Sequence, residues 1–563
     1  PDENYSDRCK GARLGLWKST AKENLSGYLN PQECGNRTGV RTLSVHDDMQ
    51  HGLTFQKASA PFEMSVLPYS AYELENAMHL DELPSVCYTW VRIAAKQMGV
   101  GGDDSWGAPV HEEYRIHADQ PMKLEFVIMP LTDHMKRKAM KIQDFQDNVT
   151  FGGFDNIFAN IYKPQDIESQ KSRYMSAVEK FTALYPNRND IHVYSAPGRT
   201  EIGGNHTDHQ HGCVIAGAVD LDVIGVAAFH DENIIRIKSE GYDEFAVSLD
   251  DLDVHIGEKG SSEIVRGIAA RFKDLGVEIS GFDIYTTSNV LAGSGISSSA
   301  AFETLIATAI DSYYNNNQIG AVEIAKIGQY AENFYFGKKS GLMDQMVCSV
   351  GGFVFLDFQN IQNPGIQKID FDLSKTGYAL IITDTKGDHS DLTDDYVAVR
   401  TEMDEVGEYF GKKVLREVDE NQFWNNLPDI KKKISDRAVL RAIHFFGDNY
   451  RAKAETEALK NNRFEDFLTL VSESGDSSMN YLQNLYSCRK PTEQGIPLAI
   501  MAGKRILKGN GAVRVHGGGF AGTVQAFVPN DLVNAYRSEM DRIFGQNSCY
   551  IMTIRPFGGI EIK

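Results

Sequence analysis

Residues 195–212 constrain what this 563-residue chain can fold into more than any other stretch. Within ten positions they place Arg199, Asn205, His206 and Asp208, and four glycines lie among and around them. Glycine lets the backbone turn sharply and approach a ligand closely, and the four side chains supply directional hydrogen bonds. A loop on the protein surface rarely needs so many such groups together. We therefore predict a site that binds a charged ligand rich in hydroxyl groups.

The composition is that of a globular protein with several domains. It is 42% hydrophobic and 24% charged, and the length predicts two to four domains. A net charge of −20 argues against nucleic-acid binding, although local charge could still favour a phosphate-bearing small ligand. The seven cysteines form no CxxC pair, so we expect reduced thiols in a cytoplasmic protein and no zinc site. No apolar run is long enough to cross a membrane.

The sequence changes character near residue 131. Residues 62–67 and 123–129 are short apolar or alternating runs separated by turn residues, which is typical of β structure. Polar, partly helical residues follow as a connector, and later the pattern becomes mixed α and β. A new strand is expected near residue 378. The predicted segments are 1–131, 132–175, 176–375 and 376–563.

A second glycine- and serine-rich run occupies residues 289–301. It follows a strand-like segment and precedes a helix-like one, residues 302–313. A glycine-rich turn that opens a helix offers free N–H groups and a positive dipole end to an anion. The run is not a Walker A loop, because no Gly-Lys-Ser/Thr follows. Taken alone, it is equally compatible with an ordinary helix N-cap.

A third run, residues 337–347, contains Asp344 among apolar neighbours. A carboxylate in such surroundings requires a partner or a chemical role. A structural ion pair is the alternative to a catalytic function.

The fourth run, residues 511–523, contains three consecutive glycines, Gly517, Gly518 and Gly519. Glycines after a strand-like Val-Arg-Val suit a sharp turn whose backbone approaches a ligand. A tight packing corner is the alternative.

The order and spacing of the four runs resemble the three motifs of the GHMP small-molecule kinases, and the first run resembles the signature of galactokinases. The resemblance covers about residues 150–563. It implies a multidomain protein in which an all-β sandwich fragment precedes an α+β kinase. That kinase would have a ribosomal S5-like domain and a ferredoxin-like C-terminal domain, with ATP and sugar between them. The implied activity is ATP- and Mg²⁺-dependent phosphorylation of the 1-hydroxyl of galactose.

The resemblance also implies residue roles. Asp344 would accept the proton of the sugar 1-hydroxyl or orient that hydroxyl, and Arg199 would lie near the transferred phosphoryl group. The implied sugar-binding residues are Asn205, His206, Asp208, Asp344 and Tyr396. The implied phosphate-binding residues are Gly293, Ser294, Gly295, Ser297, Ser298 and Ser299. Ser299 and Glu332 would bind Mg²⁺, and Gly517, Gly518 and Gly519 would support the site.

The first run departs from the commonest galactokinase pattern. Many family members have Glu-His-Thr-Asp-Tyr where this chain has Asn205 and ends the same motif with His209. Asn205 is neutral and can donate as well as accept hydrogen bonds, so contact with the sugar 6-position is open. Leu291 and Ser294 also differ from the usual phosphate loop. Another sugar 1-kinase, for N-acetylgalactosamine, arabinose or galacturonate, and a non-catalytic galactose sensor are the alternatives.

The first 131 residues resemble no kinase. Residues 30–38, 67–76 and 99–106 resemble the C-terminal domain of large β-galactosidases. The resemblance matches Trp106 to a tryptophan of the galactoside pocket, but no catalytic barrel or carboxylate pair accompanies it. We expect Trp106 to lie on or in the sandwich unless an upstream or separate β-galactosidase part supplies the rest. Because the chain opens with Pro1 and a β-galactosidase releases the sugar that a galactokinase uses, we hypothesise a larger fusion.

Overall fold

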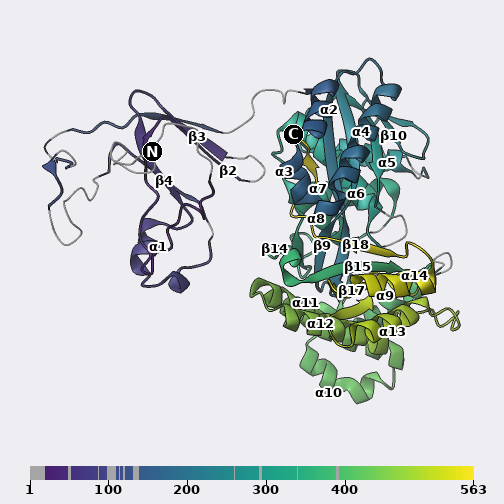
Figure 1. Cartoon of the computed structure of the whole chain (residues 1–563). Helices are drawn as coiled ribbons and strands as arrows, with labels where there is room; N and C mark the ends of the chain where they lie inside the picture. Colours follow the sequence, from purple (N-terminus) through teal and green to yellow (C-terminus); the bar gives the residue numbers. More distant parts are fainter. Residues whose placement is uncertain are drawn as a thin grey trace. The chain divides into compact units, whose positions relative to one another are not determined.

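The computed structural model describes most of the chain as two compact units, Pro1–Lys136 and Arg137–Lys563 (Figure 1). The described residues are 19–47, 52–86, 88–97, 109–112, 115–117, 119, 121–130, 139–255, 257–258, 260–290, 295–338, 340–387 and 392–563. Among them, no helix combines the length and the apolar character needed to cross a membrane. The finer boundaries near residues 131, 175 and 375 stay predictions.

The first unit is rich in β structure. Its described residues form two three-stranded antiparallel sheets. One contains β1 (Arg37–Val40), β4 (Phe62–Leu67) and β5 (Trp90–Ala94), and the other contains β2 (Thr42–His46), β3 (Gly52–Lys57) and β6 (Phe126–Pro130). Phe62 and Phe126 join the two sheets, with ring centroids 6.2 Å apart. The short helix α1 (Ala71–Asn76) begins with a capping box between Ser70 and Glu73, followed by η1 (Leu80–Glu82).

A large sheet organises the first half of the second unit. Within the described residues it has nine strands, and the main path runs β11-β10-β12-β9-β13-β14, with β8 bonded to β7, β9 and β19. The strands are β7 (Met140–Lys141), β8 (Asp190–Gly203), β9 (Cys213–His230), β10 (Ile234–Ser239), β11 (Phe245–Ser248), β12 (Gly281–Ser288), β13 (Phe353–Asp357), β14 (Gly365–Ile369) and β19 (Ile560–Glu561). The strand β8 continues through the first half of the glycine-rich run and ends at Gly203. Its ladder to β9 shifts register twice there.

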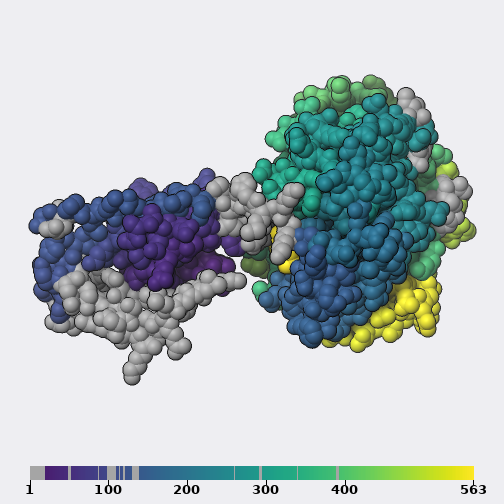
Figure 2. Space-filling view, turned by 90° about the horizontal axis from the view of Figure 1, so that it is seen from above, coloured from purple at the N-terminus to yellow at the C-terminus, as the bar shows by residue number. Residues whose placement is uncertain are grey.

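Helices cover both faces of this sheet. Alternate residues of β9 point to opposite sides and pack against different sets of helices. Ile224 and Val226 belong to a core with α2 (Ile142–Phe151), α3 (Asp155–Ile161) and α4 (Ile167–Leu184). C-terminal residues next to β19 join that core. Figure 2 shows blue and teal residues, from the first part of the second unit, covering the face of that unit turned to the viewer. Val223 and Ala227 belong to the opposite core. Helices on that side are α5 (Ser261–Asp274), α6 (Ser298–Asn315), α7 (Ala321–Tyr330), the π-helix η5 (Ala331–Phe336) and α8 (Met343–Val350).

The C-terminal part of the second unit has a ferredoxin-like topology. Its described strands pair in the order β16-β17-β15-β18, all antiparallel, with helices between β15 and β16 and between β17 and β18. The strands are β15 (Tyr378–Asp384), β16 (Ala512–Val515), β17 (Thr523–Pro529) and β18 (Cys549–Met552). The helices are η6 (Leu373–Thr376), α9 (Thr393–Tyr409), η7 (Leu415–Glu417), α10 (Glu420–Ile430), α11 (Asp436–Lys460), α12 (Phe464–Ser477), η8 (Ser478–Leu482), α13 (Gly495–Leu507) and α14 (Val533–Phe544). Together with the first half, this confirms the mixed α and β pattern predicted for this part of the chain.

Candidate active site

Arg199 and Asp344 meet where β8, α6 and α8 come together. The guanidinium Nη2 lies 2.7 Å from Asp344 Oδ1, and Nε donates to the same oxygen at 2.8 Å. The hydroxyl of Ser297, the residue before α6, donates to the other oxygen, Oδ2. Asp344 lies in the first turn of α8, so two helix N-termini point into this junction. The arrangement concentrates positive potential around one carboxylate.

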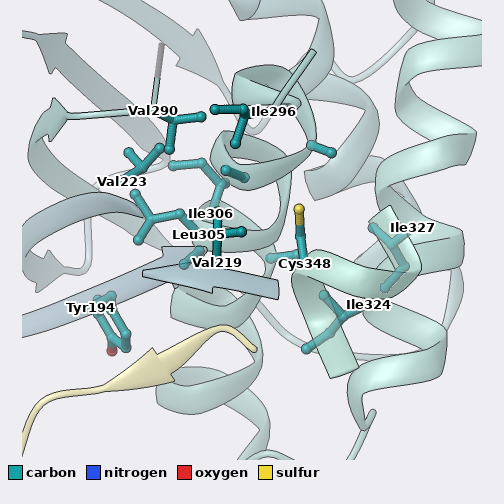
Figure 3. Close-up of a cluster of buried hydrophobic side chains, with 14 of the residues drawn as sticks. Tyr194, Val219, Val223, Val290, Ile296, Leu305, Ile306, Ile324, Ile327 and Cys348 are labelled. Atoms are coloured by element: carbon teal, nitrogen blue, oxygen red, sulfur yellow. The ribbon is translucent and has the colours of Figure 1, made fainter. Parts of the chain in front are cut away.

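A packed core supports this junction from below. Figure 3 shows Ile296 and Cys348 among buried apolar side chains. Ile296 directly precedes Ser297 in the sequence, and Cys348 follows Asp344 by one helical turn. The Arg199 N–H also donates to the Ile296 carbonyl at 2.9 Å. Because the core fixes the backbone on both sides, the polar groups above it are held in place.

The Arg199 side chain is charged and nearly buried, with 10% of it exposed. Burial works against its charge, but the Asp344 carboxylate outweighs burial and raises the pKa of Arg199 above its ordinary value. The Gly295 carbonyl accepts a further hydrogen bond from its Nη1. A guanidinium fixed in this way can offset negative charge on a phosphoryl group.

Asp208 and His206 lie on the loop that follows β8. Asp208 opens the short helix η4 (Asp208–Gln210). Burial raises the pKa of its carboxyl; the Asp344 charge adds to the shift and His206 opposes it. A Cβ on Gly341 would lie 3.2 Å from Asp208 Oδ2, so the loop before α8 passes close to this carboxyl.

The glycine turn, residues 517–519, is held by three of the predicted sugar-binding residues. Asn205 Nδ2 lies 2.7 Å from the Gly517 carbonyl oxygen, and His206 Nε2 lies 3.0 Å from the Gly518 carbonyl oxygen. The Tyr396 hydroxyl donates to the Gly519 carbonyl at 3.0 Å. Because a carbonyl only accepts, His206 Nε2 is the donor of its bond. The first and fourth runs of the sequence thus form one site.

Glu332, in η5, belongs to a buried cluster of polar side chains. Gln345 Nε2 donates at 2.9 Å to Glu332 and at 2.9 Å to Glu303, and Lys338 Nζ lies 2.6 Å from Glu332. Burial, and then the charge of Glu332, raise the pKa of Glu303 to about 8. Within the described chain, Glu303 Oε1 has no hydrogen-bond partner. Carboxylate and hydroxyl oxygens are the donors that Mg²⁺ prefers, so Glu332 and the exposed Ser299 suit this ion.

The other predicted residues either lie outside the described ranges or occupy positions that the sequence did not indicate. Gly293, Ser294, Leu291 and Trp106 lie outside the described residues. Ser298 and Ser299 occupy the first turn of α6. Asn205, predicted to face the sugar, is completely buried.

Sequence reasoning missed the residues that support this site. Gln345 follows Asp344 directly, yet an amide in an apolar run gives no sign of joining two carboxylates. His444 and Asp448 bond to the main chain of Asn205 from α11. Their spacing of four positions places them on one helix face, and that is the signal that could have drawn attention to them.

Comparisons with known proteins agree with this two-part organisation. Residues 1–128 match the family described as beta galactosidase small chain, residues 179–229 match the galactokinase galactose-binding signature, and residues 263–352 match the GHMP kinases N terminal domain. The β-galactosidase of Halalkalibacterium halodurans is 53% identical over 128 residues, which are 23% of this chain and 13% of that protein. The chain therefore spans about an eighth of the length of the β-galactosidases that it matches.

The second unit matches its relatives over most of their length. The galactokinase of Glaesserella parasuis is 31% identical over 350 residues, which are 61% of this chain and 86% of that protein. The structure of Lactococcus lactis galactokinase complexed with galactose has a TM-score of 0.59 and 24% identity. It covers 69% of this chain and 99% of the other, and so has the same fold. The chain belongs to the galactokinase family within the GHMP kinases, fused to a segment similar to the β-galactosidase small chain.

Proposed function

We propose that this chain transfers the terminal phosphoryl group of ATP to the 1-hydroxyl of galactose. The contact of Arg199 and Ser297 with Asp344, at the N-termini of α6 and α8, carries the proposal. Phosphoryl transfer requires an oriented nucleophile and neutralisation of charge on the phosphoryl oxygens. One junction offers both.

Each residue has a definite task in this proposal. The Asp344 carboxylate accepts the hydrogen bond of the sugar 1-hydroxyl and takes its proton as the new P–O bond forms. Arg199 offsets the charge on the transferred phosphoryl group. The N-terminus of α6 and its serines, with Gly293, Ser294 and Gly295 before them, hold the other phosphate oxygens.

His206 and Asp208 bind sugar hydroxyls, and Tyr396 lines the same pocket beside the glycine turn. A carboxylate and an imidazole read hydroxyl groups well because each bonds in a defined direction. The raised pKa of Asp208 means that its accepting, ionised form predominates only at higher pH than for an ordinary aspartate.

Mg²⁺ would be held by Ser299 and Glu332. The ion supplies charge neutralisation on the phosphate groups of ATP. Gln345 keeps the Glu332 carboxylate oriented through its amide. Burial of Glu332 favours a stably placed ligand.

An ADP-release assay with a panel of sugars tests the proposal. Purified protein is given ATP, Mg²⁺ and galactose, N-acetylgalactosamine, arabinose or galacturonate, and Asp344→Asn serves as the inactive control. We expect galactose to give the highest kcat/KM. Faster turnover of another sugar would assign the chain to a different sugar 1-kinase. Binding of galactose with no ADP released from any sugar would indicate a sensor.

We also propose that the first unit works with a β-galactosidase catalytic part, in the cytoplasm, where the released galactose is the substrate of the second unit. The 53% identity to a β-galactosidase supports the first half of this proposal. Removal of residues 1–136 should leave the kinase kinetics unchanged. A loss of kinase activity in a folded truncated protein would show that the units depend on one another.

A further inference from the structure

The side chain of Asn205 has no hydrogen-bonding group left for a ligand. Its amide nitrogen carries two protons, which go to Glu201 Oε1 at 2.8 Å and to the Gly517 carbonyl at 2.7 Å. Its amide oxygen has two lone pairs, which accept from Asn484 Nδ2 at 2.9 Å and from the Ser478 hydroxyl at 3.3 Å. An asparagine side chain has two donors and two acceptor positions, so all four are used.

The main chain of Asn205 is held just as completely by α11. Its N–H donates to Asp448 Oδ2 at 2.8 Å, and its carbonyl accepts from His444 Nε2 at 2.9 Å. His444 and Asp448 lie one helical turn apart, so the helix binds the residue on both sides of its Cα. Both side chains are completely buried. The peptide planes on either side of Asn205 are therefore fixed.

The partners of His444 and Asp448 are also fixed. Burial lowers the pKa of His444, so the ring is neutral, donates through Nε2 and accepts at Nδ1 from the Ser477 hydroxyl at 2.9 Å. Asp448 accepts from Arg451 Nε at 2.8 Å and from the Ser474 hydroxyl at 3.1 Å. The network is a continuous set of buried bonds from α11 and α12 to the loop after β8.

The next residue, His206, has a backbone φ of 57°, a left-handed conformation that is unfavourable for a residue other than glycine. The bonds around Asn205 hold that conformation in place. They direct the His206 ring toward the Gly518 carbonyl, beside the predicted sugar site.

We infer that Asn205 is a positioning residue that binds no sugar: it joins α11 to the glycine turn and thereby places His206. The inference rests on the proposed sugar-kinase function and deepens it. It follows that the amide at position 205 does not select for the sugar 6-hydroxyl.

Two sugars that differ only at this position test the inference. Galactose and 6-deoxygalactose are compared as substrates of the full chain, and the discrimination ratio is the kcat/KM of the first over that of the second. The variant Asn205→Asp keeps the size of the side chain but removes both amide donors and places a second carboxylate beside Glu201. Asn484→Ala removes one bond to Asn205 without approaching the sugar.

For Asn205→Asp we expect kcat/KM to fall by about 10- to 100-fold for both sugars, because two buried hydrogen bonds are lost. The discrimination ratio should stay within about twofold of the parent value. The galactose KM should rise, since His206 moves; a purely structural role would lower only the fraction of active protein. Asn484→Ala should lower kcat/KM for both sugars as well, to a smaller extent than Asn205→Asp.

A fall of the discrimination ratio by tenfold or more in Asn205→Asp, with the ratio intact in Asn484→Ala, would overturn the inference. If Asn205→Asp does not fold, the same comparison is made with Asn484→Ala and Ser478→Ala, and an altered ratio in either would contradict it. Failure of the parent protein to phosphorylate galactose would refute the proposed function instead. Calorimetric binding of the two sugars would then still measure the discrimination.

Discussion

Replacing Gly519 by alanine should damage the glycine turn far more than the same change at Gly517. Both residues have positive φ, 78° and 65°, which costs alanine about 1–2 kcal/mol. At Gly517 the new Cβ meets nothing within 4 Å. At Gly519 it would lie 2.1 Å from the Asn484 carbonyl oxygen, so the turn must move by about 1 Å to reach an allowed contact.

Such a shift breaks bonds that hold the turn. The Phe520 N–H donates to the Asn484 carbonyl at 2.5 Å, and the Tyr396 hydroxyl donates to Gly519 at 3.0 Å. Each bond left unmade in a buried place costs about 1–3 kcal/mol. We therefore expect the free energy of unfolding to fall by about 3–8 kcal/mol for Gly519→Ala and by about 1–2 kcal/mol for Gly517→Ala.

Thermal inactivation of kinase activity measures the difference. Each variant is heated over a range of temperatures, and the remaining galactose-dependent ADP release is recorded with the melting curve. Gly519→Ala should lose activity several degrees below Gly517→Ala and should have a higher galactose KM. Equal losses in the two variants would refute the reasoning, since the backbone conformation is alike and only the surroundings differ.

Three further predictions concern the chemistry and its pH range. Asp344→Asn should lower kcat by about 10²- to 10⁴-fold, because the sugar 1-hydroxyl loses the carboxylate that takes its proton. Galactose binding, measured by calorimetry, should change only a few-fold, because the other sugar contacts stay; unchanged turnover would exclude Asp344 from the reaction. Gln345→Leu should raise the Mg²⁺ concentration needed for half-maximal activity by about tenfold, since the Glu332 carboxylate loses the amide that donates a hydrogen bond to it. Mn²⁺ binding, measured by paramagnetic resonance, should weaken as well. An unchanged ion requirement would contradict the role of Gln345. Burial, and then the charge of Arg199, lower the pKa of His516 to about 3, so the stabilising effect of the neutral ring is complete above pH 6.5 and is lost as the pH falls toward 3. In His516→Gln the free energy of unfolding should therefore fall less steeply on acidification, by about 1.4 kcal/mol per pH unit in that window. An identical slope in the two proteins would contradict the pKa shift.

Much of the fold and part of the site could be predicted from local patterns. The strand before the second run, the helix after it and the new strand near residue 378 follow from hydrophobic periodicity, and the structure has β12, α6 and β15 there. The roles of Arg199, Ser297 and Asp344 follow from the resemblance to the GHMP kinases, because each run taken alone is also compatible with an ordinary cap or ion pair. The structure brings the three residues into direct contact.

The role of Asn205 could not be predicted in the same way. The Gly517 carbonyl that it binds lies 312 positions away, and Asn484 lies 279 positions away. Burial of a polar residue depends on whether distant segments satisfy its hydrogen bonds, and no local pattern records that. For the same reason no local pattern shows that strand β8 continues into the first run as far as Gly203, since pairing with β9 decides its length.

The position of the phosphate on the product shows whether this chain phosphorylates the 1-hydroxyl of galactose. The protein is incubated with ATP, Mg²⁺ and galactose, and the product is identified by phosphorus and proton nuclear magnetic resonance. We expect one phosphorylated sugar, galactose 1-phosphate in the α configuration, formed in equal amount to ADP and at least about 100-fold more slowly with Asp344→Asn. Phosphate on any other hydroxyl, or no phosphorylated galactose at all, would contradict it.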